Sequence, residues 1–177
     1  MAGHSHWKQI KHQKGSTDQK RGALFAKLLK AVTVAAREEP NPEFNPRLRT
    51  VVEKAVAANI PRDTIERAIE RSKNSAESLE DVVLEAYGPG GTAILMKGIT
   101  DSRNRTIAEV KLILKEHGAK WAEPGSVRWA FAEENEIRPK FPQELSRENW
   151  EALSSLVADL EDQDDIQSVH TNAQQPA

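Results

Sequence analysis

The chain has 177 residues, of which 38% are hydrophobic and 29% are charged, and its net charge is −2. This composition is typical of a folded protein with one medium domain or two small ones, and it excludes wholesale disorder. The absence of cysteine excludes disulfides, thiolate metal sites and cysteine catalysis, and it favours a reducing cytoplasm. We expect neither a membrane span nor a secretory signal, because no apolar run has the required length and position.

Charge is distributed unevenly along the chain. Residues 1–75 contain 15 Lys or Arg and 8 Asp or Glu, whereas residues 76–177 contain 10 and 19. The first 37 residues carry eight basic residues and one acid, Asp18. A cationic N-terminal part on an acidic body indicates a polyanionic partner.

Residues 1–15 show no hydrophobic period, and their lysines, histidines and Trp7 predict a flexible basic arm. A helix then begins at a capping box formed by Ser16 and Gln19. Its apolar side chains recur with helical spacing at Phe25, Leu28, Leu29, Val32 and Ala36. The basic side chains predicted on the far side are Lys20, Lys27, Lys30 and Arg37. The arm and this side of the helix are therefore expected to form one continuous basic surface.

Two further amphipathic helices follow the breaker-rich segment 38–46. Asn45 is the predicted cap and Pro46 the first residue of one helix, and the other runs from about Arg62 to Arg71. Short amphipathic helices can bury their apolar stripes only against one another. We therefore predict a three-helix unit over residues 17–73, inside a nucleic-acid-binding domain of residues 1–75.

From Leu79 the hydrophobic period changes to that of strands. Two apolar runs flank residues 88–91. Helices are expected to begin at Thr106, which forms a capping box with Glu109, and at Ser146. Further strands are predicted over Val127–Phe131, Ile137–Phe141 and Ile166–His170. The order predicts an α+β, ferredoxin-like split βαβ domain over residues 79–171, with both helices on one face of an antiparallel sheet. The acids at the end of the last helix are expected to fray it or to form an acidic edge; they are Glu161, Asp162, Asp164 and Asp165.

Five segments, in order, strongly resemble the YebC/PmpR family, whose mitochondrial relatives are translational activators of cytochrome c oxidase subunit I. They are AGHSHWKQIKHQKGSTDQKRGALFAKL (2–28), NPRLR (45–49), NIPRDTIERAI (59–69), EAYGPGGTAI (85–94) and DSRNRTIAEVK (101–111). Family members usually carry a third domain inserted where this chain has only residues 132–137, so the chain looks like a short form with two domains. The resemblance implies either a DNA-binding transcriptional regulator or a translation factor that acts on the ribosome and relieves stalling at proline-rich stretches. It implies no enzyme.

The residues expected to bind nucleic acid are Lys8, Lys11, His12, Lys14, Lys20, Arg21, Lys27, Lys30, Arg103, Asn104 and Arg105. A basic cluster that meets phosphates releases counterions, which gives salt-sensitive affinity; the alternative is an ordinary solvated charged face. Residues 103–105 precede a helix and offer a phosphate seat, or they serve only as local caps. Trp7 either stacks on a base or anchors the arm.

Three other features are assigned no chemistry. His4, His6 and His12 lack the spacing and acidic co-ligands of a metal site, so neither metal nor cofactor is expected. The loop YGPGG (87–91) lacks the spacing of a phosphate loop and is predicted to be a turn, the alternative being a glycine-lined edge open to RNA. No catalytic set or small-molecule site emerges. We therefore predict a non-enzymatic, cytoplasmic factor bound to structured RNA of the ribosome; the alternative is a transcriptional regulator on promoter DNA.

Overall fold

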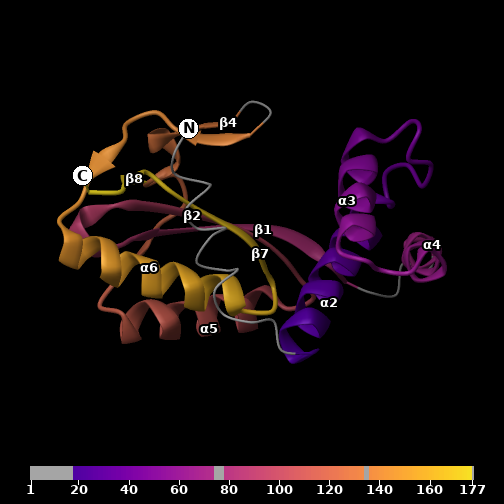
Figure 1. Cartoon of the computed structure of the whole chain (residues 1–177), viewed down its shortest axis with the longest axis horizontal. Coiled ribbons are helices and arrows are strands. Elements are labelled where there is room, and N and C mark those ends of the chain that lie inside the picture. The colour runs from indigo at the N-terminus through magenta and orange to yellow at the C-terminus, as the bar shows by residue number, and fades with distance from the viewer. Residues whose placement is uncertain (1–17, 74–77, 134–135, 177) are drawn as a thin grey trace. The chain divides into compact units, whose positions relative to one another are not determined.

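The structure of the chain is a computed structural model that describes residues 18–73, 78–133 and 136–176 (Figure 1). These residues form two compact units. The helical unit comprises residues 18–73 and 78–81 with Ile99–Ser102, and the sheet unit comprises Val82–Gly98 with residues 103–133 and 136–176. The predicted capping box depends on Ser16, which lies outside the described residues. No described helix is both long enough and apolar enough to cross a membrane.

Three helices make up most of the helical unit, as the sequence predicts (Figure 1). They are α2 (Asp18–Ala35), α3 (Pro46–Ala57) and α4 (Arg62–Arg71). Apolar side chains of all three pack into one cluster, whose buried members are Val32, Ala35, Ala36, Leu48, Ala55, Ile60, Ile65 and Ala68. Each helix therefore buries its stripe against the other two, which is the arrangement expected of short amphipathic helices.

Asn45 joins the end of α2 to the start of α3. Its Oδ1 accepts a hydrogen bond from the backbone N–H of Leu48 at 2.9 Å, so the predicted cap is confirmed. Its Nδ2 donates to the carbonyls of Ala35 and Glu39, both at 2.8 Å. The side chain is buried, and these three hydrogen bonds satisfy it.

The ends of two strands also belong to the helical unit. Ala31 and Val34 of α2 pack against Ile99 and Leu79, on the other side of α2 from its main apolar stripe. The guanidinium of Arg37 donates to the carbonyl of Leu79. Because α2 is covered from two sides, all residues from Ala31 to Ala36 are buried.

The sheet unit is an α+β fold, and the predicted fold class is confirmed. Its elements are β1 (Glu80–Tyr87), η1 (Pro89–Gly91), β2 (Ala93–Thr100), α5 (Arg103–Glu116), β3 (Lys120–Ala122), η2 (Arg128–Ala130), β4 (Phe131–Glu133), β5 (Ile137–Pro139), β6 (Gln143–Glu144), α6 (Arg147–Asp162), β7 (Ile166–Thr171) and β8 (Ala173–Gln174). The main sheet has the order β3-β1-β2-β7, with β3 antiparallel to β1 and β7 antiparallel to β2. This is the strand order of a split βαβ sheet. Two small pairs, β4-β5 and β6-β8, complete the unit.

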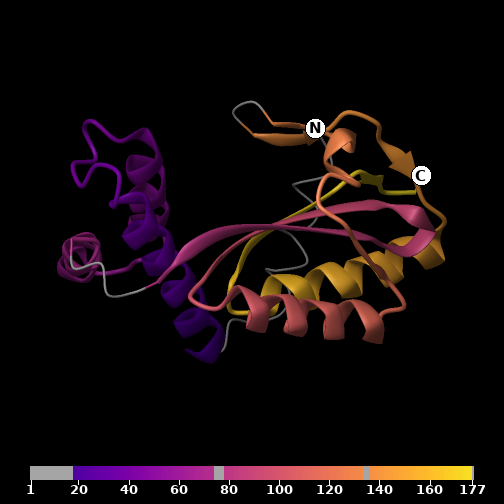
Figure 2. The same ribbon diagram turned by 180° about the vertical axis from the view of Figure 1, so that it is seen from behind.

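Both helices of the sheet unit lie on one face of the main sheet, and the β4-β5 pair lies on the other (Figure 2). The helix face buries the larger cluster, which includes Leu84, Ile94, Val110, Leu114, Leu153, Leu156 and Leu160. The opposite face buries a smaller one, which includes Leu95, Ala122, Val127, Phe131 and Ile137. β1 and β2 contribute to both clusters, because side chains alternate between the two faces of a strand.

The hairpin turn and the start of α6 agree with the sequence predictions. Gly88–Gly91 turns between β1 and β2, with Gly90 at φ 69° and the N–H of Gly88 donating to the carbonyl of Thr92 at 2.8 Å. A positive φ is a conformation that glycine adopts without steric cost. Ser146 caps α6 by accepting from the N–H of Asn149.

The prediction of a strand over Val127–Phe131 is wrong. That segment is the 3-10 turn η2 followed by β4, and Trp129 is 60% exposed. The cause is Glu85, a buried carboxylate that accepts from the N–H groups of Gly125, Val127 and Arg128 at 2.6, 2.7 and 3.3 Å. These bonds hold the segment in a turn, which the alternating pattern alone did not predict.

Two predictions about the ends of the helices of the sheet unit are also wrong. α5 begins at Arg103, so Thr106 is not its cap but a fully buried residue inside it. α6 continues to Asp162, so it does not fray early; of the four acids of the predicted edge, Asp165 is 1% exposed, whereas Asp162 and Asp164 are exposed. The two corrections are linked, because the hydroxyl of Thr106 donates to Oδ2 of Asp165 at 2.7 Å.

Candidate nucleic-acid interface

The structure describes only part of the predicted basic surface. Trp7, Lys8, Lys11, His12 and Lys14 lie outside the described residues. Lys20, Arg21, Lys27 and Lys30 all lie on α2. Lys20 and Arg21 are exposed, and Lys27 and Lys30 are half-buried. The solvated basic part of α2 is therefore its first half, since its last turns are buried on all sides and Arg37 is bound to Leu79.

A groove of about 300 Å³ lies between α2 and α4. Small and apolar side chains form most of its wall: Ala26, Leu29, Thr33, Thr64, Ala68 and Leu79. Three cations complete the lining: Lys30 from α2 and Arg67 and Arg71 from α4. The hydroxyl of Thr33 lies 3.2 Å from the carbonyl of Ala68, which marks the close approach of the two helices.

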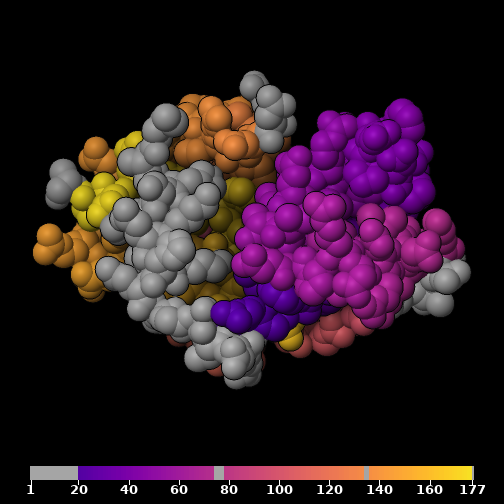
Figure 3. Space-filling model, turned by 45° about the vertical axis from the view of Figure 1, so that its right-hand side comes forward, coloured from indigo at the N-terminus to yellow at the C-terminus, as the bar shows by residue number. Residues whose placement is uncertain are grey.

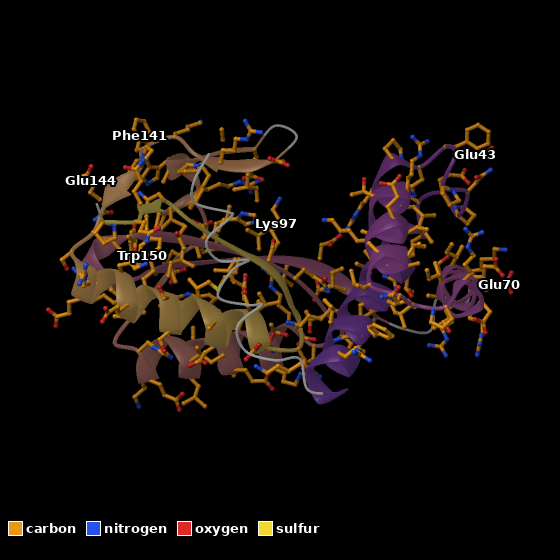
Figure 4. The ribbon with its side chains drawn as sticks, in the orientation of Figure 1. Glu43, Glu70, Lys97, Phe141, Glu144 and Trp150 are labelled. Carbon is orange, nitrogen blue, oxygen red and sulfur yellow. The ribbon has the colours of Figure 1, made fainter. Side chains whose placement is uncertain are left out.

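Charge on α4 is segregated by the way that this helix packs. The helix has three arginines and three acids, so it carries no net charge. The residues that line the groove are Thr64, Arg67, Ala68 and Arg71, with the helical spacing of a single face. The acids Asp63, Glu66 and Glu70 are exposed and outside the lining, and Figure 4 shows Glu70 on the side of α4 away from α2. The groove is consequently cationic although the helix is neutral.

One of the groove cations has an acidic neighbour. Arg67 forms an ion pair with Asp63, four residues earlier on α4, and both side chains are about two-thirds exposed. An exposed pair of this kind contributes at most about 1 kcal/mol, so a phosphate can compete for the guanidinium. Figure 3 shows the surface of the helical unit from the side of α3 and α4.

The sequence pattern alone does not mark Arg67 and Arg71 as a binding surface. In the sequence ERAIER they are flanked by acids, and the helical turn of α4 places them in the groove lining while Glu66 and Glu70 lie outside it. Arg67 and Arg71 are four residues apart, as are Thr64 and Ala68 on the same face of α4. This common helical spacing is the signal that could have identified them.

The other predicted group, Arg103, Asn104 and Arg105, occupies the first turn of α5 in the sheet unit. All three residues are exposed. Arg105 in addition has a partner within its own unit: its Nη2 lies 2.9 Å from Oδ2 of the buried Asp165. The three side chains are thus adjacent in the chain but differ in environment. Phosphate binding by this group stays a prediction.

Comparison with known proteins identifies the family. The model of the "TACO1/YebC protein N-terminal domain" matches residues 5–75, and that of the "TACO1/YebC second and third domain" matches residues 79–138. A "Probable transcriptional regulatory protein" of Aquifex aeolicus is 41% identical over 176 residues, which cover 97% of this chain and 70% of the relative. One of Petrotoga mobilis is 50% identical over 134 residues, which cover 74% of this chain and 53% of the relative.

A solved structure agrees with both the sequence match and the fold. The crystal structure of a conserved hypothetical protein from Aquifex aeolicus superposes with a TM-score of 0.85 at 30% identity, covering 97% of this chain and 98% of that one. The chain spans between 53% and 70% of the length of these two curated relatives. On these matches, the chain belongs to the TACO1/YebC family.

Proposed function

We propose that this protein is a non-enzymatic regulatory factor that binds nucleic acid through the helical unit, with the basic part of α2 and the cationic groove between α2 and α4 on the phosphate backbone. The observation that carries the proposal is the segregation of charge on α4, which turns Arg67 and Arg71 toward Lys30 and leaves the acids outside the groove. Three cations around one groove suit a chain of phosphates, because each contact releases counterions.

The names of the relatives favour DNA as the target. The similar proteins of Aquifex and Petrotoga are named as probable regulators of transcription. We therefore propose promoter DNA as the first target to test. The basic N-terminal segment would extend the same phosphate contact through Lys8, Lys11, His12 and Lys14. Trp7 would either stack on a base or anchor this segment.

Ribosomal RNA is the second candidate, and the arginines of α3 support it. Arg47 is paired with Asp81 at 2.7 Å, and Arg49 donates to the carbonyls of Pro42 and Glu43. Direct reading of bases in a DNA groove needs Arg, Asn or Gln side chains that are available to base edges. A surface that offers phosphate contacts without such a set suits recognition by shape, as in structured RNA.

Charge reversal in the groove tests the proposal. The variant Lys30→Glu/Arg67→Glu/Arg71→Glu is expected to bind target nucleic acid about ten- to a hundred-fold more weakly at moderate salt. The matched control is Lys54→Glu/Lys115→Glu/Arg147→Glu, which changes the net charge equally at exposed cations outside the groove. Equal losses in the two variants would mean that general charge, not the groove, controls affinity.

The target is decided by comparing promoter DNA with ribosomes. Footprinting on DNA and co-sedimentation with ribosomes are measured with the same protein and salt. Protection of promoter sites that the groove variant loses supports regulation of transcription. If the unchanged protein co-sediments with ribosomes but does not protect promoter DNA, and the groove variant no longer co-sediments, ribosomal RNA is supported as the target.

A further inference from the structure

A second surface, on the sheet unit, has the chemistry of a base-stacking site. Of the described aromatic side chains in that unit, three are exposed: Tyr87 on β1, Trp129 on η2 and Phe141 after β5, at 37, 60 and 58%. They lie on the face of the sheet opposite α5 and α6, and Figure 4 shows Phe141 there, next to the β4-β5 pair. Neither the family comparison nor the groove assigns a role to these side chains.

Two of the three rings share one backbone carbonyl, and the third lies beside one of them. The indole N–H of Trp129 donates to the carbonyl of Ser126 at 2.8 Å, and the hydroxyl of Tyr87 donates to the same oxygen at 3.1 Å. The ring centroids of Trp129 and Phe141 are 5.6 Å apart. The polar atoms of Trp129 and Tyr87 are thus used inside the protein, while their ring surfaces remain exposed. Such fixed rings lose little conformational entropy when a ligand covers them.

Two exposed lysines accompany the rings. Lys120 lies directly opposite Tyr87 in the β3-β1 ladder, and Lys140 precedes Phe141 in the chain. Both lysines are exposed, and no carboxylate of the described residues lies within ion-pairing distance of either. The other large exposed apolar side chain of the sheet unit, Leu112, is on α5 and therefore on the helix face. The surface combines aromatic rings with lysines and has no large exposed aliphatic side chain.

We propose that Tyr87, Trp129 and Phe141 form a stacking platform for an unpaired base of single-stranded nucleic acid, with Lys120 and Lys140 on the flanking phosphates. Aromatic rings beside cations are the usual means of binding single strands, because every base has a π-face. The centroids of Trp129 and Phe141, 5.6 Å apart, have the separation of a directly packed aromatic pair, so no base enters between the two rings and the base lies on the outer face of Trp129. This inference rests on the proposed function but uses a different unit and a different contact.

Substitution of Trp129 distinguishes stacking from simple apolar contact. Trp129→Leu keeps an apolar side chain without a π-face, and Trp129→Phe keeps a ring. We expect Trp129→Leu to weaken the binding of ten-residue oligouridylate and oligothymidylate about five- to a hundred-fold. Trp129→Phe should stay within about threefold of the unchanged protein. Duplex DNA should bind all of them equally, since its bases are not available to stack.

Leu112→Ala is the matched control, because it removes an equally exposed apolar side chain from the helix face. The inference is overturned if Trp129→Leu binds the single strands as the unchanged protein does. It is equally overturned if Trp129→Leu instead abolishes self-association in sedimentation velocity, since the surface is then an interface between two copies. The two proposals can fail separately. If the groove variant loses duplex binding but Trp129→Leu binds single strands normally, the proposed function is supported and only the stacking platform is rejected.

Discussion

The guanidinium of Arg105 lies 2.9 Å from Oδ2 of Asp165, a carboxylate that is 1% exposed and 60 residues further along the chain. The same oxygen accepts the hydroxyl hydrogen bond of the buried Thr106. The N–H of Asp165 in turn donates to Oε1 of Gln163 at 2.7 Å. This cluster ties the first turn of α5 to the segment between α6 and β7, and it stabilises the packing of the two helices on the sheet.

Replacement of Asp165 by Ala should destabilise the protein strongly. The change removes the acceptor of Thr106 and the partner of Arg105, and a buried donor without an acceptor is costly. We expect a loss of about 2–4 kcal/mol in the free energy of unfolding, measured by urea denaturation. A loss below about 0.5 kcal/mol would show that the cluster does not stabilise the fold.

Gly98 should not tolerate a side chain, although it lies inside a strand. A Cβ at this position would come within 2.7 Å of the carbonyl oxygen of Asp165 and 3.1 Å of Val82. Gly98→Ala is expected to lower the free energy of unfolding by about 1–3 kcal/mol, because the backbones must separate. Gly22→Ala is the control: a Cβ there meets nothing within 4 Å, and its place in α2 predicts stabilisation of about 0.5–1 kcal/mol. If Gly98→Ala and Gly22→Ala changed the free energy of unfolding in the same direction, this explanation would be contradicted.

Glu85 should control the loop that carries Trp129. Glu85→Ala leaves three backbone N–H groups, on Gly125, Val127 and Arg128, without their acceptor. We expect a destabilisation of about 2–3 kcal/mol and faster hydrogen exchange at these amides. If the platform binds single strands, their affinity should also fall while duplex affinity is retained. Unchanged exchange at the three amides would rule out this role of Glu85.

Glu133 predicts a pH dependence of stability. The hydrogen bond from Arg128 lowers the pKa of Glu133 below its ordinary value of 4.5, and Lys97 acts in the same direction. A carboxyl whose pKa is lowered by folding stabilises the folded state above its unfolded pKa, and this contribution is lost as pH falls through the folded pKa. Glu133→Gln should therefore cost up to about 1 kcal/mol at pH 7, because this side chain remains partly exposed. The difference from the unchanged protein should shrink as the pH falls below 4.5; a difference independent of pH would contradict the assignment.

Local signals in the sequence were sufficient for much of the fold. The caps at Asn45 and Ser146 and the apolar stripes of the helical unit depend on residues a few positions apart, and the structure confirms them. The order of elements predicted an antiparallel split βαβ sheet with its helices on one face, but it did not predict β3, which takes the place in the main sheet expected of the later strands. Errors arose where a distant partner decided the outcome, as when Glu85 held residues 125–128 in a turn and exposed Trp129.

The candidate interface was predictable only in part for the same reason. Lysines on α2 are visible as a basic cluster in the sequence. Arg67 and Arg71 become a cationic surface only when α4 packs on α2 and turns its acids away. In the sequence Asp165 is one member of an acidic run, and only the fold brings Arg105 and Thr106 into contact with it.

The salt dependence of affinity tests the central claim most directly. For a fixed duplex, the slope of log affinity against log salt counts the phosphate contacts, at about 0.9 per contact. The account predicts that Lys30→Glu/Arg67→Glu/Arg71→Glu lowers the magnitude of this slope by about two to three, while Lys54→Glu/Lys115→Glu/Arg147→Glu leaves it within about 0.5. A slope equal to that of the unchanged protein in the groove variant would show that nucleic acid does not contact the groove between α2 and α4.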